Sequence, residues 1–80
     1  MQKHIKVYFE HHGYTIADFI PCEYCKSKAV DIHHLVFRSQ GGKDEIDNLM
    51  ALCRGCHNDS HNDRKFNEIL KIIHDEKINY

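Results

Sequence analysis

Two Cys-x-x-Cys pairs constrain this chain more than any other feature of its sequence. They are Cys22 with Cys25 and Cys53 with Cys56, and residues 26–52 separate them. This spacing lets both sulfurs of a pair reach one tetrahedral zinc ion. We therefore predict a structural zinc site with all four cysteines as ligands, which leaves no coordination position open for chemistry. The alternatives are a redox motif or plain buried thiols, but no thioredoxin-like βαβ pattern surrounds either pair.

The small size of the chain explains why its fold would need a zinc ion. The 80 residues are 41% hydrophobic and 10% aromatic and include no tryptophan, so we predict one domain with a small core. Domains below about 70–80 residues usually need disulfides, a metal or oligomerisation to stay folded. Residues 1–6 lack the apolar stretch of a secretory signal, and no apolar run is long enough for a membrane span. We therefore expect a cytoplasmic protein, without a membrane partner, whose cysteines bind metal.

The charge balance narrows the range of partners. Lys and Arg number 11 against 12 for Asp and Glu, which gives a formal net charge of -1. This balance excludes a strongly basic protein that coats DNA, and it gives no reason to expect a tail that binds polyanions. It is compatible with local contacts between a few side chains and nucleic acid.

Hydrophobic spacing predicts an α+β chain that begins with a helix and two strands. We expect the helix over residues 2–12, with Gly13 as its C-terminal cap. Residues 29–37 are rich in β-branched side chains and predict a strand. Residues 49–52 predict a second strand, antiparallel to the first.

Two helices are expected after the second strand. The first carries His57 and His61, and the second begins after Asn62 or Asp63. The sequence of residues 14–20 is compatible with either an extended segment or a helical turn. The last helix has an apolar face with helical spacing, formed by Phe66, Ile69, Leu70 and Ile73.

Four histidines lie between or next to the two Cys-x-x-Cys pairs, which together we call the cysteine frame. His57 and His61 are one helical turn apart on the same face, which suits two imidazoles on one metal ion. Because neighbouring helix residues point about 100° apart, Cys56 can face the structural zinc while His57 faces a second metal site. His33 and His34 are neighbours in the expected strand, so both can serve one site only where the strand ends, twists or bulges.

The remaining histidines lie outside this frame. We expect all of them to be surface or core-edge residues, namely His4, His11, His12 and His74. For the four histidines in or next to the cysteine frame, the alternatives are a second zinc-binding set or ordinary surface positions. Their pairing as His-His and His-x-x-x-His around four cysteines favours a functional site.

Taken in order, these motifs resemble the HNH endonuclease family. The resemblance runs over residues 22–61 and rests on Cys22-x-x-Cys25, Asp31-Ile32-His33-His34, Gly41-Gly42, Asp47-Asn48-Leu49, Leu52-Cys53-x-x-Cys56-His57 and His61. It implies the ββα-metal (His-Me finger) fold, in which two antiparallel strands and a helix hold one catalytic divalent ion. With the four-cysteine zinc site and helical flanks at residues 1–21 and 62–80, the expectation is a single domain over residues 1–80.

The resemblance also implies a role for each matching residue. His34 matches the general base that activates a water for attack on a phosphodiester, and Asn48 is expected to hold the His34 imidazole through its amide or its backbone. His33, His57 and His61 match the ligands of the catalytic ion, which acts as a Lewis acid. Three imidazoles accept Mg²⁺, Mn²⁺, Ni²⁺ or Zn²⁺, so the identity of this ion stays open.

DNA is the partner that the family implies. Four basic residues are candidates to hold flanking phosphates: Arg38, Arg54, Arg64 and Lys65. A single site cuts one strand at a time, so a double-strand break needs a homodimer or successive nicks. By analogy with the family, a domain of this size acts with phage or restriction proteins, in the cytoplasm of a bacterium or a phage-infected host.

Two positions depart from the family pattern, and one alternative function stays open. Many members carry an acidic residue where His33 stands, and the proline that often follows the histidine pair is replaced by Val36 and Phe37. The alternative is a non-catalytic zinc module that binds nucleic acid or protein. Such a scaffold needs the cysteines but has no use for a positioned base, so His34 together with Asn48 favours the enzyme.

Overall fold

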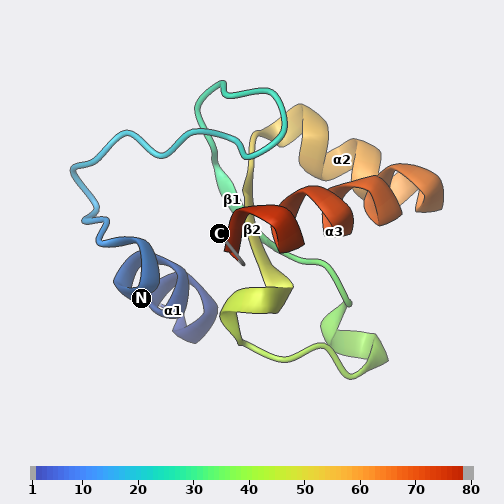
Figure 1. Cartoon of the computed structure of the whole chain (residues 1–80), viewed down its shortest axis with the longest axis horizontal. Coiled ribbons are helices and arrows are strands. Elements are labelled where there is room, and N and C mark those ends of the chain that lie inside the picture. The colour runs from blue at the N-terminus through green and yellow to red at the C-terminus, as the bar shows by residue number, and fades with distance from the viewer. Residues whose placement is uncertain (1, 79–80) are drawn as a thin grey trace.

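A two-stranded antiparallel sheet lies at the centre of the computed structural model, which describes residues 2–78 (Figure 1). The elements in chain order are helix α1 (Lys3–His12), strand β1 (Asp31–His34), 3-10 turns at Arg38–Gln40 and Ile46–Asn48, strand β2 (Leu49–Leu52), helix α2 (Arg54–Asn62) and helix α3 (Arg64–Ile78). Asp31 pairs with Leu52, and His34 pairs with Leu49. The predicted α+β class is confirmed: a ββα unit has one helix before it and one after it. Among the described residues, no helix has the length and apolarity to cross a membrane.

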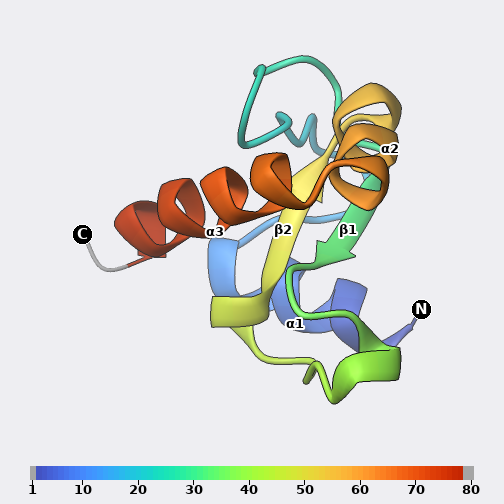
Figure 2. The same ribbon diagram turned by 90° about the vertical axis from the view of Figure 1, so that its right-hand side faces the viewer.

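Side chains alternate along β2 and divide the core into two clusters. Met50 and Leu52 pack in one cluster with Leu70 of α3. Leu49 and Ala51 pack in the other with α1. Successive strand residues point to opposite faces, so this strand, buried along its whole length, contributes to both clusters. Figure 2 shows the result, with α1 on one side of the strands and α2 and α3 on the other.

Strand β1 is shorter than the predicted residues 29–37 because Asn48 interrupts the ladder. Its Oδ1 accepts the N–H of Val36 at 2.7 Å, and its Nδ2 donates to the Val36 carbonyl at 3.1 Å. The last ladder hydrogen bond runs from the Leu35 N–H to the Asn48 carbonyl at 2.9 Å, and the Asn48 amide binds the backbone of the next residue as the chain bends. Gly42 closes the same bend, since a Cβ there would lie 1.7 Å from the Val36 oxygen. The chain therefore leaves the sheet directly after His34.

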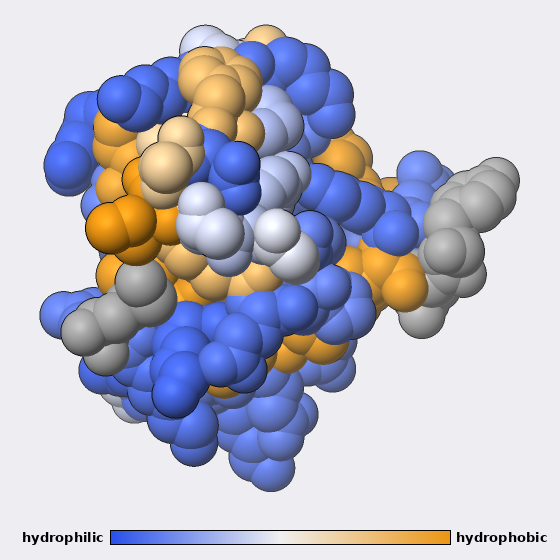
Figure 3. Space-filling view, turned by 90° about the vertical axis from the view of Figure 1, so that its left-hand side faces the viewer, coloured by the Kyte–Doolittle hydropathy of each residue, from blue (hydrophilic) through white to orange (hydrophobic). Residues whose placement is uncertain are grey.

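The first helix ends at its predicted cap. Gly13 has a φ of 73°, and its N–H donates to the carbonyl of Phe9. The segment that follows, residues 14–20, forms turns and irregular backbone and leaves Ile16 and Phe19 largely exposed. Figure 3 shows apolar and hydrophilic surface interleaved on this side of the molecule.

Helix α3 begins as predicted and buries most of its predicted apolar face together with two polar residues. Asp63 Oδ1 accepts the N–H groups of the next helical residues, at 3.0 and 3.3 Å. Ile69, predicted on the apolar face, is 48% exposed. The fully or nearly buried stripe runs through Asn67, Leu70 and His74. The other predicted residues, Phe66 and Ile73, pack against the core together with Leu70. The prediction of the apolar face is therefore wrong only for Ile69, and it did not include the two buried polar side chains.

A buried polar network explains why His74 is not the surface or core-edge residue that we predicted. Its Nδ1 lies 2.8 Å from Glu23 Oε1, and its Nε2 lies 2.7 Å from the Ile46 carbonyl. Both partners are acceptors, so the ring donates from both nitrogens and is an imidazolium. The Glu23 hydrogen bond raises the pKa of His74 against the opposing effect of burial. Glu23 also accepts from the Tyr8 hydroxyl at 2.6 Å, so the network joins α1, the first cysteine pair and α3.

Candidate active site

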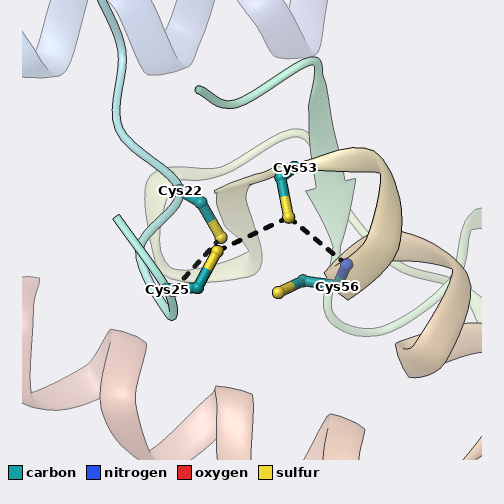
Figure 4. Close-up of side chains that lie close together, drawn as sticks. All are labelled: Cys22, Cys25, Cys53 and Cys56. Carbon is teal, nitrogen blue, oxygen red and sulfur yellow. Dashed lines mark hydrogen bonds between the residues drawn. The ribbon is translucent and has the colours of Figure 1, made fainter. Parts of the chain in front are cut away.

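The four cysteines lie together where the first Cys-x-x-Cys turn meets the start of α2 (Figure 4). Their sulfurs lie within 4.8 Å of one another, and all four are free thiols. The sulfurs of Cys25 and Cys53 are 3.6 Å apart. Two thiolates at about 2.3 Å from a tetrahedral zinc would be separated by about 3.8 Å, so this spacing fits a shared metal and not a disulfide.

The charge of the cluster also fits a bound cation. Hydrogen bonding from Ser27 lowers the pKa of the Cys25 thiol to about 6. The N–H of Cys56 lowers the pKa of Cys53, whose sulfur caps the first turn of α2. Burial raises the pKa of Cys56, because its thiolate would sit unpaired among other sulfurs. A divalent ion removes this conflict, since it holds all four groups as thiolates.

His33, His57 and His61 form a second cluster of ligand atoms within 4.8 Å of one another. His33 comes from β1, and the other two come from α2. Nε2 of His57 lies 3.1 Å from Nε2 of His61. One metal at about 2.0–2.1 Å from each nitrogen accommodates this separation. Burial lowers the pKa of His33 to about 4, so its ring is neutral and has a lone pair to offer.

Two residues outside the predicted site orient these histidines. Asp31 Oδ2 accepts from Nδ1 of His57 at 2.9 Å, which leaves Nε2 of His57 for a metal. Asn67 Oδ1 accepts from Nε2 of His33 at 2.9 Å, which leaves Nδ1 of His33. Such partners fix the tautomer and direction of a ligand ring. Asp31 stands in the family motif without an assigned role, and Asn67 lies beyond the motif, so only its place on α3 reveals it.

His34 points to a different set of neighbours from His33. Its Nε2 lies 2.7 Å from Asp44 Oδ1, and the two side chains are 13% and 15% exposed. This hydrogen bond is the main reason that the pKa of Asp44 is lowered, with help from the Arg38 guanidinium at 3.2 Å. The ring of His4, from α1, lies 4.8 Å from the His34 ring between centroids. Sequence reasoning missed Asp44 because it stands in a run of charged loop residues, which usually face solvent.

Asn48 does not bond to the His34 imidazole as predicted. Its amide is used by three backbone contacts, two to Val36 and one to the Lys43 carbonyl at 3.0 Å. These bonds hold both ends of the loop between the strands, and Lys43 is the residue before Asp44. The Asn48 amide therefore contacts the loop that carries Asp44, and among the described residues it makes no hydrogen bond to the His34 ring.

A cleft of about 560 Å³ opens onto both histidine groups. Its lining includes all four histidines in or next to the cysteine frame, together with His4, Phe37 and Arg38. His33 and His34 both line this cleft, but they belong to different clusters of ligand atoms, as expected for neighbours in a strand. A second groove of about 520 Å³ adjoins it across Phe37 and His61 and contains Arg64. Arg54 instead pairs with Asp31 at 3.6 Å, and Lys65 is exposed at the start of α3.

A ββα unit with a four-cysteine cluster and a histidine-lined cleft defines the class of the protein. The family model for HNH endonucleases matches residues 22–63, more than half of the chain. The chain belongs to the HNH endonuclease family. It is also similar to the type IV methyl-directed restriction enzyme EcoKMcrA of Escherichia coli (strain K12), with 30% identity over 63 residues, covering 66% of this chain and 23% of that enzyme. The chain thus spans about a quarter of that relative. No solved structure matches it significantly.

Proposed function

We propose that the chain is a metal-dependent endonuclease that hydrolyses DNA phosphodiester bonds. The observation that carries this proposal is the shared cleft, in which a carboxylate-held histidine lies beside a cluster of three metal-binding imidazoles. A zinc module that only binds nucleic acid or protein would need the four cysteines alone. Family membership supports nuclease chemistry, and the restriction enzyme relative supports DNA as the substrate.

His34 acts as the general base in this proposal, and Asp44 positions it. Asp44 accepts the Nε2–H of His34, which fixes the tautomer and leaves the Nδ1 lone pair to take a proton from the attacking water. The same division of labour between an imidazole and a buried carboxylate operates in hydrolytic triads. Asn48 supports the pair by bonding the loop backbone next to Asp44.

His33, His57 and His61 would hold the catalytic divalent ion. When bound, that ion supplies Lewis-acid stabilisation of the charge that develops on the phosphate and leaving-group oxygens. Asp31 and Asn67 keep the ligand nitrogens directed at one point. Imidazole ligands suit Ni²⁺ and Zn²⁺ better than Mg²⁺, so we expect stronger activation by the later transition metals.

Basic side chains around the two grooves would hold the flanking phosphates. Arg38 lines the cleft and Arg64 lines the second groove, so these two are the strongest candidates. Arg54 and Lys65 are exposed near the ends of α2 and α3 and would contact phosphates farther away. We propose that residues 1–80 act as one domain that nicks a single strand, and that a double-strand break requires a second copy.

The test is a supercoiled-plasmid assay with added Mg²⁺, Mn²⁺, Ni²⁺ or Zn²⁺. We expect wild type to convert supercoiled to nicked DNA, and we expect His34→Ala to be slower by about 100-fold or more, the usual contribution of a general base. His11→Ala is the matched control, because His11 is an exposed histidine of α1. Undiminished nicking by His34→Ala would contradict the base assignment. No nicking with any of the metals would favour the non-catalytic zinc module.

A further inference from the structure

A third group of metal-binding side chains lies on the other side of His34. His4, His34 and Asp44 have ligand atoms within 4.8 Å of one another. They come from three separate parts of the chain: helix α1, strand β1 and the loop between the strands. His4 lies outside residues 22–63, so the family match does not include this group.

His4 has an unmet need for a partner. Its Nδ1 is buried, and within residues 2–78 it has no hydrogen-bond partner. Buried polar atoms are nearly always paired with protein, water or an ion, so an unpaired nitrogen on an imidazole that belongs to a cluster of ligand groups requires an explanation. The neighbouring Asp44 contributes the negative charge that a cation requires, and its side chain is only 15% exposed.

We propose that His4, His34 and Asp44 form a second divalent-cation site in the cleft, suited to zinc. Two imidazoles and one carboxylate are a ligand set that zinc accepts, with a fourth position left for water. Binding would separate His34 Nε2 and Asp44 Oδ1, now hydrogen-bonded at 2.7 Å, to about 3.3 Å, the separation of tetrahedral zinc ligands. The Arg38 guanidinium would leave Asp44, which is a small movement for a side chain that is 61% exposed.

Occupation of this site would switch the enzyme off, a consequence that rests on the proposed function. The ion would use His34 and displace the Asp44 hydrogen bond that fixes its tautomer. The base could then no longer accept a proton from water. Zinc binds imidazole-containing sites more tightly than Mg²⁺ or Mn²⁺, so excess zinc would fill this site while one of those ions supports nicking. Zinc would therefore inhibit nicking that another metal supports.

Metal counting on the full chain tests the site without any need for activity. Wild type is saturated with Zn²⁺, exchanged into buffer with a slight excess of the ion, and counted by native mass spectrometry and calorimetric titration. We expect His4→Ala to bind one zinc ion fewer than wild type, and His11→Ala to bind the same number as wild type. Equal counts for wild type and His4→Ala would overturn the proposal.

A second variant protects this test against misfolding. Asp44→Asn keeps the size of the side chain and removes its charge, and it too is expected to lose one zinc ion. Circular dichroism shows whether each variant is folded. His57→Ala removes a ligand of the other histidine cluster, so combining it with His4→Ala should lower the count by two. A combined loss of only one ion would mean that both variants affect a single site, which overturns the proposal.

Inhibition of plasmid nicking by zinc tests the proposed effect of this site on activity. Plasmid nicking is started with Mg²⁺ or Mn²⁺, and Zn²⁺ is then added in steps to wild type, His4→Ala and His11→Ala. Relative to its own zinc-free rate, His4→Ala is expected to retain more activity than the other two proteins. Equal inhibition of all three would overturn the inhibitory role. If wild type nicks no DNA at all, the proposed function fails, and the ion count still decides whether the site exists.

Discussion

The four-cysteine cluster and the histidine cleft place metal ligands in the same small molecule in contrasting ways. The cysteines come from two short motifs, and the hydrogen bonds that their sulfurs make in the described residues stay within those motifs or reach Ser27, two residues away. The histidines of the cleft depend on Asp31, Asp44 and Asn67, which lie on three different elements or loops. A structural site can thus be encoded locally, whereas a reactive site needs orientation from the whole fold.

Replacement of one cysteine is the test with the largest expected effect, and it should abolish the fold. Cys25 is exposed, so Cys25→Ser costs almost no buried area. If the cluster holds a zinc ion, its loss removes folding free energy that the small core cannot replace. We expect Cys25→Ser to lose one zinc ion and its cooperative thermal transition, measured by metal analysis and circular dichroism. Ser39→Ala, at an exposed position away from the cysteines, should keep both, and a folded Cys25→Ser protein without zinc would contradict the structural role.

Removal of one histidine should have the opposite outcome, with activity lost and the fold retained. His61 is exposed on α2, and its ring contacts the other ligands of the cluster. We expect His61→Ala to lower metal-supported nicking to background while its thermal midpoint stays near that of wild type. His11→Ala should nick at the wild-type rate. Full activity of His61→Ala would remove it from the ligand set.

Local motifs made the fold class and the clustering of the cysteines and histidines predictable. The cysteine spacing, the paired histidines and the cap at Gly13 are short-range patterns whose geometry follows from a few bonds. The end of β1 was less predictable, because it is decided by the Asn48 amide, which takes the backbone groups of Val36. Asn48 was identified from its motif, but its contacts depend on a loop whose path the motif does not specify.

Residues that act across the fold were the least predictable. Asp44, Asn67 and His74 each meet a partner at least ten residues away along the chain. Hydrophobic periodicity assigns no meaning to a buried polar residue, so it placed Phe66, Leu70 and Ile73 of α3 against the core but did not predict the burial of Asn67 and His74. Only the tertiary structure shows which polar side chains have a partner in the interior.

The buried network around His74 tests whether the flanking helix is part of the same folding unit. His74→Ala leaves the Glu23 carboxylate buried without its cation, and breaking such a pair usually costs about 3–5 kcal/mol. We expect this loss in the free energy of unfolding, measured by urea denaturation with zinc present. Asp75→Ala, at an exposed neighbouring position, should have little effect. If His74→Ala lowered the free energy of unfolding as little as Asp75→Ala does, α3 would not belong to the same folding unit as the core.

The same network predicts how the folding stability changes with pH. The pKa of His74 is raised in the folded chain, so its contribution is complete below about pH 6.5, the unfolded value, and is lost as pH rises through the folded value. The pKa of Glu23 is lowered, so its contribution is present above about pH 4.5 and is lost at more acidic pH. The difference in stability between wild type and His74→Ala should therefore be largest between these limits and should shrink towards alkaline pH.

The smallest expected effect concerns Asp31 and sharpens the contrast between the two metal sites. Asp31→Asn keeps an oxygen for His57 Nδ1 but removes the charge that strengthens this hydrogen bond. Loss of such an orienting partner weakens metal binding by about 10- to 100-fold. We expect this change in Mn²⁺ or Co²⁺ affinity, measured by titration, whereas the zinc of the four cysteines should be unaffected. Asp59→Asn, an exposed position on α2, is the control. If Asp31→Asn instead released the cysteine-bound zinc, the two sites would share their support, and the contrast between a locally encoded site and a fold-dependent one would not hold.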